Sequence, residues 1–599
     1  MPDLDRLVLL PRPRRLEARG GEGAPRGGEG APRGAAAELR PDASLPRDAF
    51  TLEIGGGAVR IRHGGGGARR YAEETLRQLR QQSGAALPAL RIDDAPDFPV
   101  RGYMLDVSRD RVPTRDTLAR LVDLMALLRL NHLELYTEHT FAYRDHETVW
   151  RDASPITPED VRWLDALCRE RDIELSANQN CFGHMGRWLA HEAYRARAEA
   201  PGGFRTKLGI ELPPGVLEPT EDNAAFALAL CRELLACHTS RRIHIGCDET
   251  FELGRGKSQA RVEAEGRGRV YLDHLLRLLR PLQREGAEVL FWGDILRHHP
   301  ELVPELPKEG TIACAWHYEA PQPDAALPEG LLAVLAEFGI DRASFAGFAT
   351  HVDAFARSGL PFWVCPGTSS WNTLIGRLPN ARGNLLDAAE IGLARSASGY
   401  LITDWGDNGH MQPPSVSYAP LAYGAAVSWC LAANRDLALA PALDAFVFED
   451  DARVLGAALE ALGSAYAGTG KIALNGSPLF TDLLQGGLLG SFGTPSADGV
   501  RRTVETLDAA VAALGRAAPR AADGALAVRE LRQAARLARH GALRIARAAG
   551  LPCPSDPELR RDLADAIAEQ RACWALRARP GGLADSAARL EATLARYAV

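Results

Sequence analysis

Short apolar segments alternate with amphipathic segments of helical periodicity through the middle of the chain. The apolar segments predict strands at residues 102–108, 132–138, 173–180, 242–248, 288–294, 311–318, 361–367 and 399–405. Between most of them, apolar residues at helical spacing predict helices at residues 114–128, 158–171, 224–237 and 258–284. Strands that alternate with helices are typical of an α/β protein with a parallel sheet. Eight such strands predict a (β/α)8 TIM barrel.

A doubly wound parallel sheet is the main alternative for this alternation. That fold places a glycine-rich, phosphate-binding turn directly after its first strand. Here the first predicted strand runs into residues 106–110, DVSRD, which contain no glycine. The barrel is therefore the favoured architecture.

A region of different composition precedes the predicted barrel. Alternation over residues 52–61, around a run of three glycines, predicts two short strands, and residues 70–82 have the spacing of an amphipathic helix. The sequence GGEGAPR occurs twice in succession and forms a glycine-rich, low-complexity insert at residues 20–34. We expect a small α/β domain over residues 1–97, interrupted by this insert.

The composition changes again after the last predicted strand. Alanine, leucine and arginine dominate with helical periodicity, notably at residues 509–514, 525–549 and 557–579. We therefore expect a catalytic barrel over residues 98–435 and a C-terminal helical domain over residues 436–599.

Charge and hydropathy exclude two classes of partner. The net charge of −7 is spread over the chain without a basic stripe, so a nucleic-acid partner is not expected. The longest apolar runs fall short of the roughly 20 residues that span a bilayer, so a membrane partner is not expected either.

The start of the chain and the cysteines point to a cytoplasmic location. The first residues, MPDLDRLVLLPRPRRLE, place acids before a short apolar run that prolines interrupt, unlike an export signal. The ten cysteines are scattered without paired spacing, which favours reduced, buried thiols.

Polar and aromatic side chains gather at the C-terminal ends of the predicted strands, the face on which TIM-barrel active sites lie. The set comprises Asp106, Arg109, Glu138, His139, Asn180, His184, Asp248, Glu249, Trp292, Asp294, Trp316, Tyr318, Trp371, Trp405 and Asp407. Several tryptophans around one barrel mouth indicate a platform for a sugar. The substrate that we expect is a glycan.

The adjacent carboxylates Asp248 and Glu249 indicate a particular chemistry. Glycosidic bond cleavage needs an acid on the leaving oxygen and a group that stabilises the oxocarbenium ion. Neighbouring side chains in a regular strand face opposite ways, so both carboxylates reach one pocket only where the strand ends and twists. One carboxylate can then protonate the leaving group while the other orients a 2-acetamido group, whose carbonyl oxygen attacks the anomeric carbon. Their proximity should also separate their pKa values.

The surrounding motifs resemble a known family. RIHIGCDE, which ends at Glu249, resembles the HIGGDE signature of glycoside hydrolase family 20, with Cys247 in place of the second glycine. The LGRG that follows, FGHM at residues 182–185 and FWGDIL at residues 291–296 resemble the hexosaminidase D branch of that family. The resemblance covers about residues 5–435. It implies a retaining exo-β-N-acetylhexosaminidase that acts on terminal β-linked GlcNAc or GalNAc by substrate-assisted catalysis, without cofactor or metal.

The resemblance also implies roles for single residues. Asp248 would orient the acetamido group, Glu249 would be the general acid and then the base, and His184 would support the acid. Arg109 would grip O3 and O4 of the sugar, and Asp407 would bind O4 or O6. The implied pocket walls are Trp292, Trp316 and Trp405, with Tyr318 as the hydroxyl that meets the acetamido oxygen. Trp371 is expected to bind the substrate beside them because of its place at a strand end.

The second predicted strand departs from the family pattern. That strand usually ends in two aspartates, the first of which is linked to the supporting histidine. Here it ends in Glu138 and His139, and an ungapped comparison places His139 on the first aspartate. Glu138 takes that place after a small shift, so both residues stay candidates for supporting His184.

Two other functions remain compatible with the residues. A metal-dependent barrel hydrolase would use His184, His244, Asp248 and Glu249 as ligands, although His244 lies within a predicted strand. A carbohydrate-binding protein on a catalytically inactive barrel would tolerate the altered Glu138-His139 pair, but would not need an intact Asp-Glu pair.

Overall fold

The structure is a computed structural model that describes residues 7–18, 30–205, 211–322, 332, 335, 342–484 and 490–597. The predicted glycine-rich insert lies outside the described residues except for residues 30–34.

Eight parallel strands close into a barrel, which confirms the predicted TIM fold. The strands are β8 (Val100–Asp106), β9 (His132–Tyr136), β10 (Glu174–Asn178), β13 (Arg242–His244), β14 (Glu288–Trp292), β15 (Thr311–Trp316), β16 (Phe362–Cys365) and β17 (Gly399–Asp404). The first and last strands pair over their length, from Gly399 opposite Val100 to Asp404 opposite Leu105. Seven of the segments predicted as strands contain one of these strands, and the segment predicted at residues 102–108 overlaps β8, which begins two residues earlier.

Helices lie between the barrel strands and after the last of them. They include α2 (Arg115–Leu127), α4 (Pro158–Arg169), α7 (Glu221–Leu235), α8 (Gln259–Glu265), α9 (Arg267–Arg284), α11 (Ala349–Ser358), α12 (Leu378–Ala394) and α13 (Tyr418–Trp429). Thr114, Thr157 and Thr220 each accept a backbone N–H of the first turn of α2, α4 and α7, which satisfies an otherwise unpaired donor. The helix predicted over residues 258–284 is divided at Gly266, whose φ of 87° breaks the helical path.

Large side chains fill the barrel interior. A cluster of buried residues inside the barrel comprises Met104, Tyr136, Leu290, Trp292, Ile312, Cys314, Trp363, Cys365, Trp371, Leu401 and Trp405. Because these side chains leave no pore, they form a solid floor beneath the mouth of the barrel.

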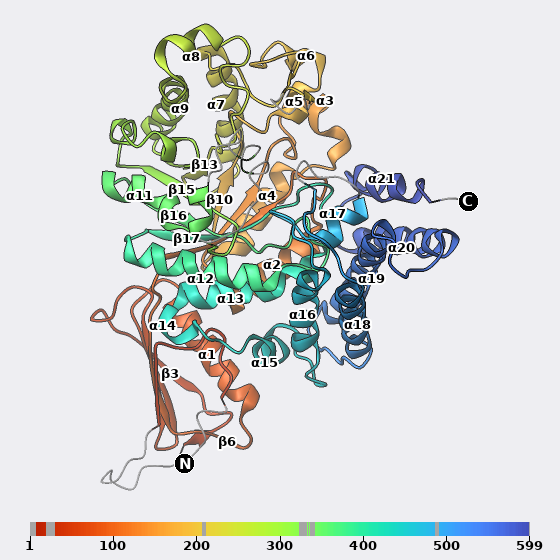
Figure 1. Cartoon of the computed structure of the whole chain (residues 1–599). Coiled ribbons are helices and arrows are strands. Elements are labelled where there is room, and N and C mark those ends of the chain that lie inside the picture. The colour runs from red at the N-terminus through yellow and green to blue at the C-terminus, as the bar shows by residue number, and fades with distance from the viewer. Residues whose placement is uncertain are drawn as a thin grey trace.

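The N-terminal region forms a five-stranded sheet covered by one helix. The sheet order is β1 (Arg15–Ala18), β7 (Leu90–Asp94), β4 (Phe50–Gly55), β5 (Ala58–His63) and β3 (Ala37–Pro41), and the helix is α1 (Ala68–Gln82). This unit lies at the lower left of Figure 1, below α13. The two strands and the helix predicted from residues 52–61 and 70–82 are therefore present.

A buried ion pair joins this unit to the barrel. Arg129, which follows α2, donates to Asp94 at 2.7 Å and to Thr75 at 2.7 Å. Asp94 also accepts the indole N–H of Trp429 at 3.0 Å. Both charged side chains of the pair are fully buried.

Long helices make up the C-terminal region and lie against one flank of the barrel (Figure 1). They are α16 (Leu455–Ser464), α17 (Pro478–Leu484), α18 (Ala497–Leu514), α19 (Gly524–Ala548), α20 (Asp556–Arg577) and α21 (Leu583–Leu594). Most of their buried apolar residues belong to the same continuous cluster as those between the barrel strands and helices. The domain limits at residues 97 and 435 stay predictions. Within the described residues, no helix combines the length and apolar character that a membrane crossing requires.

The buried pair predicts a large stability change. Asp94→Asn should lower the free energy of unfolding by about 3–5 kcal/mol, because the charge of Arg129 would stay buried without its counterion. Urea denaturation of the whole chain measures this. Glu17→Gln, in an exposed pair with Arg15, is the control and should change it by less than about 1 kcal/mol. Equal effects of the two changes would contradict the proposed importance of the buried pair.

Candidate active site

The turn after β13 directs two neighbouring carboxylates into one cavity. Gly246, Cys247 and Glu249 have φ values of 66°, 73° and 49°, in the left-handed region that most residues avoid. A side chain at Gly246 would come within 2.3 Å of the Asn180 side chain, so glycine is required there. Cys247 adopts this conformation without the freedom of a glycine, at a cost of about 1–2 kcal/mol.

Three hydrogen bonds hold the turn in this shape. The backbone N–H of Cys247 donates to Asn180 at 3.1 Å, and its carbonyl accepts from the Tyr271 hydroxyl at 2.9 Å. The backbone N–H of Glu249 donates to Asp294 at 3.1 Å. Strained backbone persists where surrounding contacts determine it in this way, and such sites are often functional.

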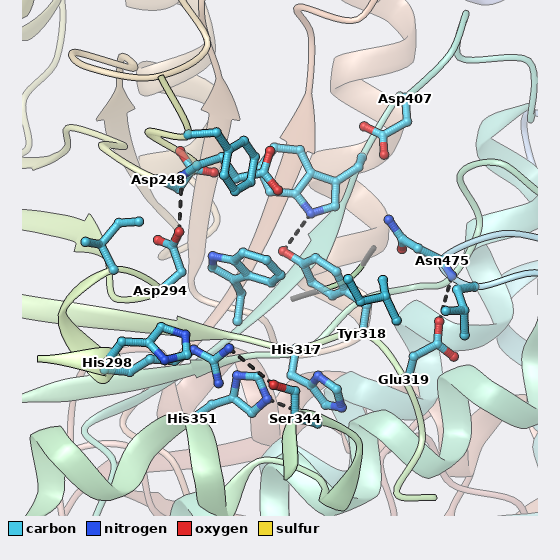
Figure 2. A pocket seen from close by; sticks show the side chains of 18 of the residues that line it. Asp248, Asp294, His298, His317, Tyr318, Glu319, Ser344, His351, Asp407 and Asn475 are labelled. Carbon is cyan, nitrogen blue, oxygen red and sulfur yellow. Dashed lines mark hydrogen bonds between the residues drawn. The ribbon is translucent and has the colours of Figure 1, made fainter. Parts of the chain in front are cut away.

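The cavity lies at the C-terminal ends of the barrel strands and has a volume of about 560 Å³. Residues from several strand ends line it, as Figure 2 shows. Of the residues predicted from sequence, the lining includes Arg109, His184, Asp248, Glu249, Trp316, Tyr318, Trp371, Trp405 and Asp407. A cavity of this size accommodates a sugar together with part of what it is attached to.

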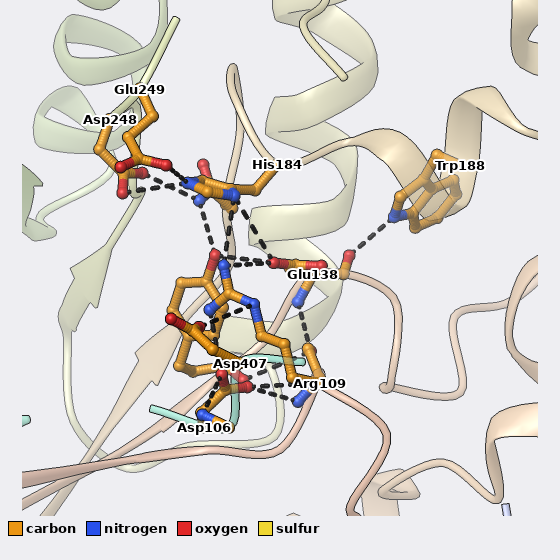
Figure 3. Close-up of polar contacts among 12 residues, drawn as sticks. Asp106, Arg109, Glu138, His184, Trp188, Asp248, Glu249 and Asp407 are labelled. Atoms are coloured by element: carbon orange, nitrogen blue, oxygen red, sulfur yellow. Dashed lines mark hydrogen bonds and ion pairs between the residues drawn. The ribbon is translucent and has the colours of Figure 1, made fainter. Parts of the chain in front are cut away.

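His184 contacts both carboxylates through one ring nitrogen (Figure 3). Its Nε2 is 3.2 Å from Asp248 Oδ2 and 3.4 Å from Glu249 Oε2. The preceding Gly183 packs so closely on this turn that a side chain there would come within 2.2 Å of the Asp248 carbonyl oxygen. The loop after β10 and the turn after β13 therefore fit together as one unit.

The side chains of His184, Asp248 and Glu249 have pKa values that give them different charges. Burial alone would lower the pKa of His184, but the charge and hydrogen bond of Asp248 raise it to about 9. Burial alone would raise the pKa of Asp248, but His184 and Asn180 hold it below its ordinary value. Burial raises the pKa of Glu249, the charge of Asp248 adds to this, and the opposing charge of His184 does not cancel it. An ionised Asp248 thus lies beside a carboxyl that retains its proton more readily.

Arg109 is fixed by the protein before any substrate arrives. It forms ion pairs of 3.0 Å with Asp106 and 3.2 Å with Glu138. Its guanidinium also lies 4.8 Å from the ring centre of Tyr136 and 4.9 Å from that of Trp405. Such a clamped guanidinium can donate to neighbouring hydroxyl groups without losing much conformational entropy.

The structure distinguishes the two candidates at the end of β9. Glu138 Oε1 is 3.9 Å from His184 Nδ1 and accepts the Tyr136 hydroxyl at 3.0 Å. Neither residue is part of the cavity lining, and His139 Nδ1 has no hydrogen-bond partner among the described residues. Burial lowers the pKa of His139 to about 3, so it is neutral. Glu138 is therefore the residue that the structure brings to His184.

The aromatic residues form two layers, one in the cavity wall and one in the barrel floor beneath it. Trp316 stacks on Tyr318 with ring centres 5.3 Å apart, and Trp371 meets Tyr318 edge-on at 5.0 Å. The indole N–H of Trp405 donates to the Tyr318 oxygen at 2.8 Å. Trp292 is fully buried and lies outside the cavity lining, 5.9 Å from Trp405 between ring centres. The wall contact predicted for Trp292 does not form, because its side chain belongs to the floor beneath Trp405.

Several residues of the cavity lining had no role assigned to them from the sequence. Asp294 lines the cavity, and burial followed by the charge of Asp248 raises its pKa to about 8. Its place at a strand end was a usable signal. Leu474 and Asn475 reach the cavity from the C-terminal region, and no motif in the sequence pointed to them.

The metal-ligand set of the alternative hydrolase does not assemble. His244 is fully buried, packs against Trp292 at 4.2 Å between ring centres, and is not part of the cavity lining. Across the described ranges, no group of three or more histidine, cysteine, aspartate or glutamate side chains is placed to hold a metal ion.

The charge distribution predicts an unusual titration of His184. In protein labelled with ¹⁵N-histidine, the imidazole should remain protonated at neutral pH and titrate near pH 9. In Asp248→Asn, burial would remain without the compensating charge, so the pKa should fall below the ordinary value of about 6.5. His184→Gln identifies the signal. Titration near 6.5 in both proteins would contradict the arrangement.

Comparisons with known proteins agree with this geometry. Residues 98–340 match the glycosyl hydrolase family 20 catalytic domain. Hexosaminidase D of Homo sapiens is 28% identical over 211 residues, which cover 34% of this chain and 41% of that protein. Hexosaminidase D of Bos taurus is 25% identical over 191 residues, which cover 31% of this chain and 52% of that protein. The match thus spans about half or less of these curated relatives.

One solved structure matches almost the whole chain. The X-ray structure of Flavobacterium johnsoniae chitobiase aligns with 94% of this chain and 97% of its own, with a TM-score of 0.56 and 15% identity. At that identity the likeness concerns the fold. The likeness to a family rests on the match of residues 98–340 and on the two curated relatives. Residues 98–340 of this chain are therefore similar to the catalytic domain of glycosyl hydrolase family 20.

Proposed function

We propose that this protein is a retaining exo-β-N-acetylhexosaminidase that removes terminal β-linked GlcNAc or GalNAc by substrate-assisted catalysis. One observation carries the proposal: Asp248 and Glu249, adjacent in sequence, face one cavity with pKa values shifted in opposite directions. A carboxylate that stays ionised and a carboxyl that keeps its proton are the two groups that this reaction needs.

The first step breaks the glycosidic bond. Glu249 gives its proton to the leaving oxygen, and the acetamido oxygen of the substrate attacks the anomeric carbon from the opposite face. The product alcohol departs and a cyclic oxazolinium ion remains on the sugar. Asp248 accepts the acetamido N–H, which orients the nucleophile and balances the positive charge that forms on it.

The second step restores the enzyme. Glu249, now ionised, removes a proton from a water molecule, which attacks the anomeric carbon and opens the oxazolinium ring. Two displacements at one carbon leave the configuration unchanged. Glu249 keeps 38% of its side-chain surface exposed, so water and the leaving group can reach it.

His184 acts on both carboxylates. As a cation at Nε2 it stabilises ionised Asp248 throughout and ionised Glu249 after proton transfer, because the distances are 3.2 and 3.4 Å. The other ring nitrogen, Nδ1, is 3.3 Å from the Arg109 guanidinium, whose charge opposes that charged state, and 3.9 Å from Glu138 Oε1. Glu138 therefore takes the supporting role that the sequence left open, and we assign His139 no contact with the sugar.

The cavity walls fit a sugar that carries an acetamido group. The Tyr318 oxygen accepts the Trp405 N–H, so its own proton is directed away from Trp405, and we assign it to the acetamido oxygen. Arg109 and Asp407, whose side chains are 4.0 Å apart, would bind the sugar hydroxyls O3, O4 or O6. Trp316, Trp371 and Trp405 supply apolar surface for the ring and the acetamido methyl.

The reaction needs neither cofactor nor metal, because the acetamido oxygen and the carboxyl groups supply nucleophile, acid and base. A cytoplasmic location is part of the proposal. Its support is that all ten cysteines are free thiols and nine of them are buried.

Replacing the acid tests the proposal. Glu249→Gln keeps the shape but cannot protonate a leaving group, so kcat/KM on substrates with alkyl leaving groups should fall by about 100- to 10,000-fold. Activated aryl glycosides, which need no acid, should lose less than about tenfold.

An exposed residue on α8 supplies the control for this change. Glu263→Gln, at an exposed residue outside the cavity lining, should leave kcat/KM unchanged for both kinds of substrate. Equal losses in Glu249→Gln for alkyl and aryl leaving groups would show that Glu249 is not the acid.

A further inference from the structure

A segment of the C-terminal region completes the wall of the cavity. Leu474 and Asn475 lie between the short helix η8 (Ala465–Thr469) and α17, and both line the cavity. The other lining residues that the structure describes come from Arg109 to Asp407, within the barrel region. The match to the family's catalytic domain ends at residue 340, so nothing in that match assigns this segment a role.

The backbone of Asn475 is anchored to the loop after β15. Its N–H donates to Glu319 Oε1 at 2.8 Å. Glu319 is itself held by two hydrogen bonds of 3.0 Å from Arg377. A residue fixed in this way presents its side chain to the cavity in one position.

The orientation of the Asn475 amide follows from one contact. The indole N–H of Trp371 donates to Asn475 Oδ1 at 2.9 Å. An indole nitrogen can only donate, so the amide oxygen must face Trp371 and the amide nitrogen must face away from it. Asn475 has a φ of 48°, a conformation that asparagine tolerates better than most residues.

A chain of asparagines links Asn475 to the loop that carries Asp407. Asn408 donates to Asn372 Oδ1 at 3.0 Å, and Asn372 donates to the Asn475 carbonyl at 3.3 Å. In Figure 2 the side chain of Asn475 points into the cavity from the same side as Asp407. A fixed amide donor and a carboxylate acceptor therefore share one side of the cavity.

We propose that Asn475 is a specificity-determining residue, and that its Nδ2 donates a hydrogen bond to the hydroxyl of the terminal sugar whose proton Asp407 accepts. A hydroxyl has one proton to give and lone pairs to receive, so an acceptor and a donor together satisfy it. The hydroxyl is O4 or O6, the two positions assigned to Asp407. This inference rests on the proposed hexosaminidase function.

Two substitutions distinguish a hydrogen bond from Asn475 to the sugar from a purely structural contact between Asn475 and Trp371. Asn475→Asp keeps the size, the acceptor for Trp371 and the tolerance for a positive φ, but removes the donor. Asn475→Gly keeps the backbone conformation and removes the whole side chain. Both should lower kcat/KM on aryl β-GlcNAc by roughly 5- to 30-fold, mainly through KM, because the lost contact binds substrate and transition state alike.

A residue on the same segment supplies the control. The side chain of Ile472 is 63% exposed, and Ile472 does not line the cavity. Ile472→Ser should leave kcat/KM unchanged. If Asn475→Asp also leaves kcat/KM unchanged while Asn475→Gly lowers it, Asn475 only supports Trp371 and the proposal is overturned.

Deoxy substrates locate the contact. The effect of Asn475→Asp should shrink to less than about twofold on either the 4-deoxy or the 6-deoxy aryl substrate, because that substrate lacks the hydroxyl concerned. An undiminished effect on both substrates would overturn the proposal.

The wild type separates the two levels of inference. A wild-type protein that neither hydrolyses aryl β-GlcNAc nor binds GlcNAc in calorimetry refutes the proposed function, and with it this inference. An active wild type whose Asn475 variants behave like Ile472→Ser refutes the role of Asn475 alone.

Discussion

The left-handed turn at the end of β13 is the constraint on which the site depends. In a regular strand Asp248 and Glu249 would point to opposite faces, and only one of them could meet a ligand. The positive φ values of Gly246, Cys247 and Glu249 rotate both side chains to the mouth of the barrel. The proposed chemistry follows from that rotation, because it places an ionised carboxylate beside one that keeps its proton.

The rest of the site maintains this turn and exploits it. Asn180, Tyr271 and Asp294 bind its backbone groups, and Gly183 allows the neighbouring loop to pack against it. His184 is carried on that loop and acquires a raised pKa from Asp248. The strain of the turn, the position of the histidine and the charges of the carboxylates are thus parts of one arrangement.

The sequence predicted the barrel well because its signal is repeated at every strand. Alternation also located the strand ends, so ten of the polar and aromatic residues that the sequence places there line one cavity. The split at Gly266 and the short length of β13 depend on single positive φ values, which periodicity cannot show.

The errors of detail have similar causes. Trp292 is the last residue of its strand, but its side chain is fully buried in the floor of the barrel. A position at a strand end does not determine how deeply a side chain is buried, so the sequence could not show this. The choice between Glu138 and His139 required knowing where the chain turns after Tyr136. Asn475 reaches the cavity only through tertiary packing of the C-terminal region, and local sequence carries no signal of such a contact.

The central claim is that the substrate's acetamido oxygen is the nucleophile, held by Asp248 while Glu249 protonates the leaving group. The most direct test is kcat for aryl glycosides whose acetyl group carries none, one, two or three fluorines. We expect kcat to fall with each fluorine, because each withdraws electron density from the attacking oxygen, and to fall less steeply in Asp248→Asn. A kcat almost independent of the acyl group, together with a protein carboxylate labelled covalently by a 2-fluoro sugar, would contradict the account.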